Sequence, residues 1–406
     1  MVLYNRAHYS VFLSDMIRST LLTLALLLLS ASPLWANVDV RVAYLEAFQK
    51  RPPTLSNLDP IPPDEGLQGA KLGRNENATT GTFLKHQYEL LTYTLDEDDD
   101  LLETAREALE AADFLVVNAS RDDLLAIADL PQAQSRVIFN ASVADSDLRS
   151  AECRSNLLHT LPSRAMRADA LAQFAVKKKW TDWALIAGPQ DADKAFANAL
   201  DRSANKFGVR IRDRKDWTFD ADMRRSAASE VPLFTQSLSD HDLLVIADEA
   251  NDFARYIAFN TWDPRPVAGS EGIVPAAWHR AVEQHGAAQL QNRFRELAGR
   301  DMRAVDWAAW AAVRSIGEAV TRTNSADPDT VRDFLFSDAF QLGGFKGRKL
   351  SYRRWNGQLR QPMPLAHPRA VVALAPLEGF LHRTNELDTL GLDQPESDCT
   401  AMGDTG

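Results

Sequence analysis

Two short apolar segments that end in the same three residues constrain the fold of this chain most strongly. Residues 114–120 read FLVVNAS and residues 137–142 read VIFNAS. Neither apolar run alternates with polar residues, which is typical of parallel strands covered on both faces. Ligands of open α/β sheets bind beyond the carboxyl ends of such strands. The candidate ligand-binding residues at these two ends are Asn118, Ser120, Asn140 and Ser142.

The same polar residues have a simpler explanation, because Asn and Ser are also common in turns and helix caps. Ser120 is followed three residues later by Asp123, which fits a variant capping box with Asp in place of Glu. The repeated Asn-Ala-Ser ending instead favours a shared role in binding. The sequence leaves both interpretations open.

The order of the expected elements is that of an α/β protein. Up to residue 160 strands and helices alternate, which indicates right-handed crossovers that build a parallel sheet. A second αβ unit of similar size follows and ends near residue 269. The expected elements of the first unit are strands 38–45, 87–95, 114–118 and 137–140, with helices from about Gly66 and Leu102. Those of the second are helices 163–178 and 191–207 and strands 183–188, 209–212, 243–247 and 266–269.

The last third of the chain changes in character. Two helices are expected at 287–298 and 305–323, and a short one at 327–336 that begins after Asp327. From Leu350 onward strands and turns are expected, with Asn356-Gly357 as a hairpin signal. Residues 386–406 are expected to form a C-terminal tail.

The first 36 residues have the pattern of a secretory signal. Arg18 provides a basic start, residues 21–29 are apolar, and Ala36 ends a plausible cleavage site. Met16 is an alternative start. The apolar run is too short for a confident membrane span and none like it follows, so we expect a soluble periplasmic protein with no membrane insertion after cleavage.

The charge and the cysteine content of the chain limit its classes of binding partner and indicate a disulfide. The net charge is -11, and it becomes -12 without residues 1–36, which carry two basic and one acidic side chain. An acidic chain without a basic cluster disfavours nucleic acid and anionic membranes as partners. The only two cysteines are Cys153 and Cys399. In an exported protein a disulfide between them is expected, with two free buried thiols as the alternative.

Signals for metal binding and catalysis are weak. Asp96, Asp98, Asp100 and Glu107 have the spacing of a calcium loop, but Leu101 occupies the position that requires Gly. A charged helix start explains this run better. Gly-x-Ser-x-Gly, phosphate-loop and paired His or Cys motifs are missing, so we expect neither an enzyme nor a bound cofactor.

The segment Phe340-Gln-Leu-Gly-Gly-Phe-Lys-Gly347, with Leu350-Ser-Tyr352 and Asn356-Gly-Gln358, resembles the periplasmic substrate-binding proteins of branched-chain amino-acid ABC transporters. The resemblance covers nearly the whole chain after residue 36. It implies a type I periplasmic binding fold, in which two Rossmann-like lobes close around a ligand. The implied lobes are 37–160 with 284–342, and 161–283 with 343–385.

A narrower resemblance rests on the closing stretch. Gln361-Pro, Ala366-His-Pro368, Glu378-Gly-Phe380 and residues 390–399 are similar to a subgroup encoded beside pyrroloquinoline quinone (PQQ)-dependent alcohol dehydrogenases. It implies a function in alcohol oxidation, with an ABC permease or a periplasmic dehydrogenase as partner. An accessory protein that assists such a dehydrogenase without transport is the alternative.

The family pattern also suggests residues in the second lobe. Asp248 or Glu249 would receive a ligand ammonium, with a helix cap as the simpler role. Trp278 could stack on a planar ligand or pack between elements. Arg164 could meet an anionic ligand, although a solvent-exposed arginine is the simpler expectation. The loop after the first strand lacks the Gly, Pro and Ser or Thr that are usual in this family. The resemblance therefore does not imply an amino-acid ligand.

Overall fold

The computed structural model describes residues 37–50, 60–219 and 226–403. The signal expected over residues 1–36 lies outside the described residues, as does part of the Pro-rich loop, residues 51–59. Among the described residues, none of the helices combines the length and the apolar character needed to cross a membrane.

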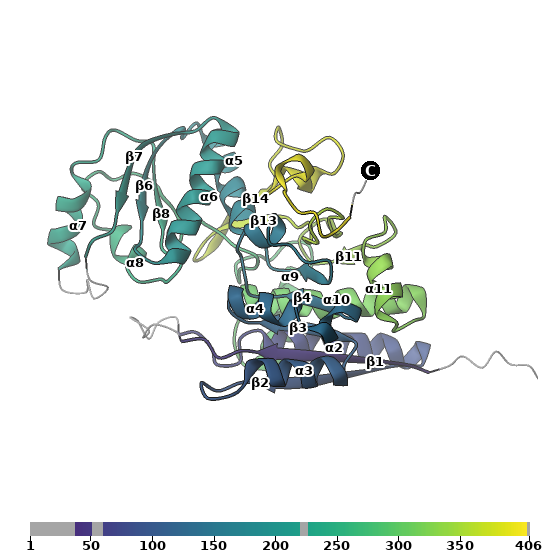
Figure 1. Cartoon of the computed structure of the whole chain (residues 1–406). Helices are drawn as coiled ribbons and strands as arrows, with labels where there is room; N and C mark the ends of the chain where they lie inside the picture. Colours follow the sequence, from purple (N-terminus) through teal and green to yellow (C-terminus); the bar gives the residue numbers. More distant parts are fainter. Residues whose placement is uncertain (1–36, 51–59, 220–225, 404–406) are drawn as a thin grey trace, which may run out of the picture. The chain divides into compact units, whose positions relative to one another are not determined.

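The first sheet contains the two segments that end in Asn-Ala-Ser (Figure 1). Its order is β2-β1-β3-β4-β5, and the pairs β1–β3, β3–β4 and β4–β5 are parallel. All residues of β3 and β4 are buried, which confirms the prediction of strands covered on both faces. The strands are β1 (Val38–Glu46), β2 (His86–Thr94), β3 (Phe114–Asn118), β4 (Val137–Asn140) and β5 (Leu157–His159).

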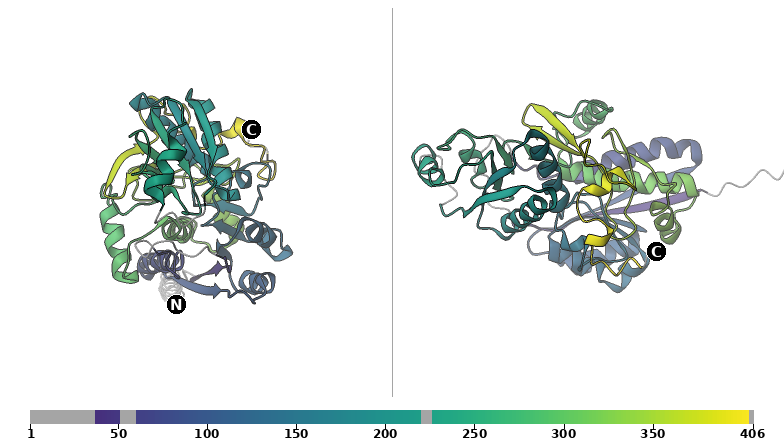
Figure 2. Two further views of the ribbon diagram at one scale, coloured as in Figure 1. Left: turned by 90° about the vertical axis from the view of Figure 1, so that its left-hand side faces the viewer. Right: turned by 90° about the horizontal axis from the view of Figure 1, so that it is seen from above.

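Helices from two distant parts of the chain cover this sheet. One core is formed by the strands with α3 (Leu101–Ala111) and α4 (Arg121–Ala128). α2 (Leu67–Leu84) and α10 (Ala304–Thr323) lie side by side, as Figure 2 shows in its right-hand view, and α10 also contacts β3. The other elements of this part are α9 (Ala287–Ala298), α11 (Pro328–Leu335) and the 3₁₀ turns η1 (Pro131–Ser135) and η2 (Asp147–Arg149).

The second sheet repeats this architecture. Its order is β7-β6-β8-β9, with all pairs parallel. Apolar residues fill both of its faces, one towards α5 and α6 and the other towards α7 and α8. The strands are β6 (Asp182–Ala187), β7 (Arg210–Asp216), β8 (Leu243–Ala247) and β9 (Val267–Gly269), and the helices are α5 (Arg164–Lys178), α6 (Asp191–Phe207), α7 (Ala227–Thr235) and α8 (Ala254–Ile257).

β7 differs from its prediction in length. The expected strand ended at Arg212, whereas β7 continues to Asp216 with alternately exposed residues. β7 lies at the edge of the sheet, where one face contacts water. A search for apolar runs underestimates such a strand because half of its side chains are polar.

Antiparallel segments complete the fold. β10 (Val274–Pro275), β13 (Met363–His367) and β14 (Ala370–Ala375) form one small sheet, and β11 (Leu342–Gly343) pairs with β12 (Lys349–Leu350). A bridge between Tyr352 and Leu359 closes the hairpin expected at Asn356-Gly357, and Gly357 has the positive φ of 66° that this turn requires.

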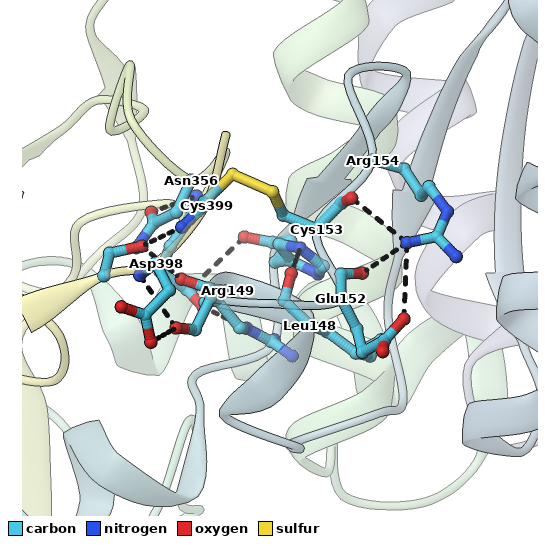
Figure 3. Close-up of a disulfide and its surroundings, with 12 residues drawn as sticks. Leu148, Arg149, Glu152, Cys153, Arg154, Asn356, Asp398 and Cys399 are labelled. Carbon is cyan, nitrogen blue, oxygen red and sulfur yellow. Dashed lines mark hydrogen bonds and ion pairs between the residues drawn. A yellow bond between two sulfur atoms is a disulfide. The ribbon is translucent and has the colours of Figure 1, made fainter. Parts of the chain in front are cut away.

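The segment after residue 385 packs against the rest of the chain. It contains η3 (Glu386–Thr389) and η4 (Gln394–Glu396), and Leu390 is fully buried. The expected disulfide joins Cys153 to Cys399, as Figure 3 shows. Next to it, the amide of Asp398 donates a hydrogen bond to Oγ of Ser150. The bridge therefore fastens this segment to the loop between η2 and β5.

Candidate functional site

The ends of β3 and β4 lie side by side, as their shared sequence predicted. Val117 pairs with Asn140 in the parallel register. Oγ of Ser142 accepts a hydrogen bond from the amide of Ala119 at 3.0 Å and donates one to the carbonyl of Ala119 at 3.1 Å. Ser142 is half-buried. Its hydroxyl therefore joins the two strand ends at the edge where a ligand would approach.

Asn118 points into a polar cluster beneath this edge. Its amide nitrogen donates to Oη of Tyr44 and to the carbonyl of Glu65, both at 3.3 Å, and its oxygen accepts from Gln49 at 3.4 Å. Burial and the nearby carboxylate of Glu46 raise the pKa of Tyr44, so its hydroxyl stays protonated. Asn118 thus connects the end of β3 to the start of the α2 region.

Asn140 shapes the turn after β4. Its oxygen accepts from the amides of Ser142 and Val143, at 3.1 and 2.8 Å, and its nitrogen donates to the carbonyl of Val143. The same nitrogen lies 3.0 Å from Nδ1 of His159. Burial and the charge of Arg149 lower the pKa of His159, so the neutral ring accepts from Asn140 at Nδ1.

Ser120 acts as the N-cap of α4. Its hydroxyl oxygen accepts from the amide of Asp123 at 3.2 Å and donates to the carboxylate of Asp123 at 2.7 Å. This is the capping role that the sequence left open as the alternative to ligand binding. Ser120 is nevertheless exposed, so its hydroxyl is accessible from the same edge as Ser142.

Asp248 follows β8 and also acts as a cap. One oxygen accepts from the amide of Asp252, and the other accepts from Phe253 and Ala254, all at 2.8 Å. The carboxylate is buried, at 3% exposure. These bonds organise the short helix α8, which is the capping role weighed for this residue.

Glu249 belongs to a group of charges that spans the two sheets. Its carboxylate binds both terminal nitrogens of Arg167, at 2.7 and 3.0 Å, and lies 3.5 Å from Nε of Arg164. Arg164 also pairs with Asp145 at 2.7 Å. Burial disfavours the charged form of Glu249, but the two arginines outweigh it and leave the pKa below its ordinary value.

This charge group corrects one expectation and adds residues that the sequence did not single out. Arg164 was expected to be exposed, but its side chain is only 11% exposed because it bridges two carboxylates. Asp145 follows β4 and Glu249 follows β8, so Arg164 connects a loop of the first sheet with a loop of the second. Arg164 and Arg167 are three residues apart and therefore share a helix face. This spacing could have predicted that they bind a common partner.

Trp278 lies apart from these strand ends. It is buried, its Nε1 donates to Gln291 at 3.0 Å, and its ring stacks on Trp307 with 10° between the planes. Trp278 lines two cavities. One has a volume of about 800 Å³ beside residues 60–63 and 300–304, and the other about 450 Å³ beside β14. The packing against Trp307 agrees with the structural alternative, and the residue also contributes to the walls of both cavities.

The structure thus brings Asn118, Ser120, Asn140 and Ser142 to one edge and connects it with Glu249 through Asp145 and Arg164. Trp278 lies elsewhere. Across residues 37–50, 60–219 and 226–403, three or more His, Cys, Asp or Glu side chains nowhere gather in a way that could hold a metal ion.

Comparison with known proteins identifies this architecture. The family described as "Periplasmic binding protein" matches residues 66–370. A branched-chain amino-acid ABC transporter periplasmic ligand-binding protein of Burkholderia xenovorans superposes with a TM-score of 0.69 at 17% identity, covering 90% of this chain and 100% of that one. No curated protein matches the sequence.

Two further similar structures contain ligands. An ABC transporter substrate-binding protein of Desulfitobacterium hafniense in complex with Leu has a TM-score of 0.60 at 15% identity, covering 82% of this chain and 98% of that one. A solute-binding protein of R. palustris in complex with benzoate has a TM-score of 0.60 at 11% identity, covering 89% and 99%. At these identities the likeness shows the fold.

Proposed function

Because the chain belongs to the periplasmic binding proteins, we propose that it captures a small organic molecule between two lobes and delivers it to an ABC permease. The observation that carries this proposal is the contact of Arg164 with both Asp145 and Glu249. These acids follow strands of different sheets, so the carboxyl ends of β4 and β8 converge on one helix start. Ligands of α/β folds bind at such ends.

The proposed lobes are residues 37–160 with 284–342, and residues 161–283 with 343–385. The two parallel sheets, each with its own apolar core, support this division. The chain passes between the sheets more than once, as expected for a hinge that allows closure around a ligand.

The proposed ligand contacts are Ser142 and Ser120 on the first lobe and the guanidinium of Arg164 or Arg167 opposite them. Ser120 is exposed and Ser142 is half-buried at this edge, whereas Asn118, Asn140 and Asp248 are buried. A carboxylate ligand would compete with Glu249 for the arginines. The similar proteins in complex with Leu and with benzoate support an organic acid.

A finer proposal concerns the biological setting. The closing stretch around Glu378-Gly-Phe380 and Cys399 resembles the subgroup associated with PQQ-dependent alcohol dehydrogenases. We infer that the ligand is a compound of alcohol oxidation, that residues 1–36 direct the protein to the periplasm, and that it has no enzymatic activity. An accessory protein of a periplasmic quinoprotein dehydrogenase is the second candidate, supported by the same stretch.

The test combines mass spectrometry of co-purifying compounds with thermal unfolding in the presence of amino acids, alcohols, aldehydes and carboxylic acids. A ligand that binds the folded state raises the melting temperature. We expect Ser142→Ala to weaken this stabilisation. Ser337→Ala, which removes a hydroxyl bonded to the carbonyl of Phe334 at the end of α11, should not change it.

The transport proposal is contradicted if no compound of these classes stabilises a ligand-stripped sample. Capture of a quinoprotein dehydrogenase by such a sample would favour the accessory function instead.

A further inference from the structure

Lys346 is a buried lysine that has no negative partner among the described residues. It lies between β11 and β12 and is 2% exposed. Burial lowers the pKa of its amine well below the ordinary value, and no charge in the described part of the chain offsets this effect. A buried charge is costly unless it is paired and fully hydrogen-bonded.

The neighbours of the amine are neutral groups in fixed positions. Nζ lies 2.5 Å from Oε1 of Gln361 and 3.4 Å from the centre of the Trp307 ring. The nitrogen of Gln361 donates to the carbonyl of Thr160 at 2.8 Å, so the oxygen of that amide must face the lysine. An ammonium group has three donors, and Gln361 accepts one of them. The π face of Trp307 stabilises the cation but supplies no anion.

Lys346 is one of the residues that line a cavity of about 450 Å³. Its volume is in the range of small-molecule sites, about 300–1,000 Å³. Glu283, His285 and Arg369 also line the cavity, but they are exposed, so water screens their charges. The apolar wall is formed by Trp278, Ala281, Val282, Pro364, Val371 and Leu374.

We propose that this cavity is a second ligand site, which binds a small monocarboxylate with its charged group on Nζ of Lys346 and its apolar part against Trp278 and Val282. The anion would supply the missing negative charge and accept the remaining N–H donors. A single buried cation matches a single carboxylate, and the apolar wall matches an aryl or alkyl group. The site is separate from the strand ends of β3, β4 and β8.

The experiment compares phenylacetate with its uncharged analogue phenylacetamide by isothermal titration calorimetry on the full chain. We expect wild type to bind phenylacetate at least about tenfold more tightly, because charge-assisted hydrogen bonds are roughly twice as strong as neutral ones. Lys346→Met should abolish this preference. The matched control is Lys349→Met, which removes the same charge from an exposed position on β12.

A second variant tests the cavity without altering the lysine. Val371 is half-buried on β14, and Val371→Trp should fill the space and prevent binding while circular dichroism stays unchanged. The inference is overturned if wild type binds phenylacetate no better than phenylacetamide. It is also overturned if Lys346→Met and Val371→Trp both bind phenylacetate as tightly as wild type does. Binding that survives in these variants but is lost in Ser142→Ala would support the site between the lobes and contradict this one.

Discussion

At the scale of single residues, buried charges in this protein are of two kinds. Glu249 is paired with two arginines, and Asp388 with Arg353, whose side chains are 3% and 1% exposed. Lys346 instead contacts an amide oxygen and an aromatic face. Both groups bind their proton more weakly in the folded protein than in the unfolded chain, so deprotonation favours folding at both sites. The cause differs, because arginine partners lower the pKa of Glu249 whereas burial lowers that of Lys346.

Glu249→Gln should lower the free energy of unfolding by about 3 kcal/mol near neutral pH, since it leaves Arg167 without its carboxylate partner and Arg164 with Asp145 alone. The folded protein holds the pKa of Glu249 below its ordinary value, so the carboxylate stabilises wild type above that value. The contribution is lost as the pH falls through the folded pKa. Urea unfolding of both proteins over this range measures the difference.

The control for this prediction is Asp240→Asn, which removes the partner of Arg265 from a carboxylate that is 87% exposed. Its stability should stay close to that of wild type at every pH, because exposed ion pairs contribute little. A wild-type advantage over Glu249→Gln that did not shrink in acid would contradict the role of the charge.

Lys346→Met should reveal a pH dependence of the same direction in the absence of ligand, but in the alkaline range. The folded protein binds the Lys346 proton more weakly than the unfolded chain does, because burial lowers the pKa. Wild type should therefore gain stability relative to the variant as the pH rises from the folded pKa towards the ordinary lysine value. Thermal unfolding at increasingly alkaline pH measures this gain, and two parallel curves would show that the buried amine does not titrate as described.

At the scale of elements, the closest packing in the first sheet's layer is between α2 and α10. A Cβ on Gly69 would lie 1.9 Å from the carbonyl oxygen of Asp306, and one on Gly73 would lie 3.0 Å from Cβ of Val313. The two helices can approach this closely only because α2 has no side chains at these positions. This contact joins residues more than 230 positions apart in the chain and holds the late helix pair on the first sheet.

Gly69→Ala should destabilise the protein by about 1–3 kcal/mol, because the added methyl group forces the helix backbones apart. Gly343→Ala is the matched control, since a Cβ there meets no atom within 4 Å and its φ is not in the left-handed region. Chemical unfolding of the two variants measures the contrast. Equal stabilities would mean that the helices adjust without cost.

Elements whose buried residues form an apolar run or recur at helical spacing could be predicted from the sequence. An element whose length depends on pairing with another strand could not. The strands β3, β4, β6 and β8 agree with their predictions because their apolar runs are visible in the sequence. The helix α9 agrees because its buried residues recur at helical spacing. The edge strand β7 extends further than expected because its exposed residues are charged.

The candidate site was predictable to a similar degree. The strand ends of β3 and β4 were identified from a repeated motif, and Ser142 does join them. The partners of Glu249 were missed because an ion pair between residues 82 positions apart leaves no local pattern. The burial of Lys346 was also missed, because nothing in the sequence distinguishes a buried lysine from an exposed one.

At the scale of the whole molecule, segments far apart in the chain are fastened to one another near residue 160. Arg149 donates to Oε1 of Gln358 at 2.9 Å, and the amide nitrogen of Gln358 donates to the carbonyls of His159 and Leu161. The residues that leave the first sheet are therefore bonded directly to the hairpin after β12. The disulfide between Cys153 and Cys399 adds a covalent connection in the same region (Figure 3).

Replacing both cysteines, as Cys153→Ser with Cys399→Ser, should lower stability by at most about 5 kcal/mol, because the bond closes a very long loop in the unfolded chain. The control is wild type treated with a reductant, which should unfold at the same temperature as the double variant. An unchanged melting temperature would show that the hydrogen bonds of residues 386–398 suffice to hold this segment.

The 246-residue separation of the two cysteines also has a consequence in time. Any ribosome makes Cys153 first, and at about 5–20 residues per second its partner follows on the order of tens of seconds later. During that interval Cys153 has no second cysteine to pair with, because Cys153 and Cys399 are the only cysteines of the sequence. Oxidation of this pair is thus a late event in biogenesis, and a thiol-alkylating pulse given to nascent chains should label Cys153 until residue 399 has been released.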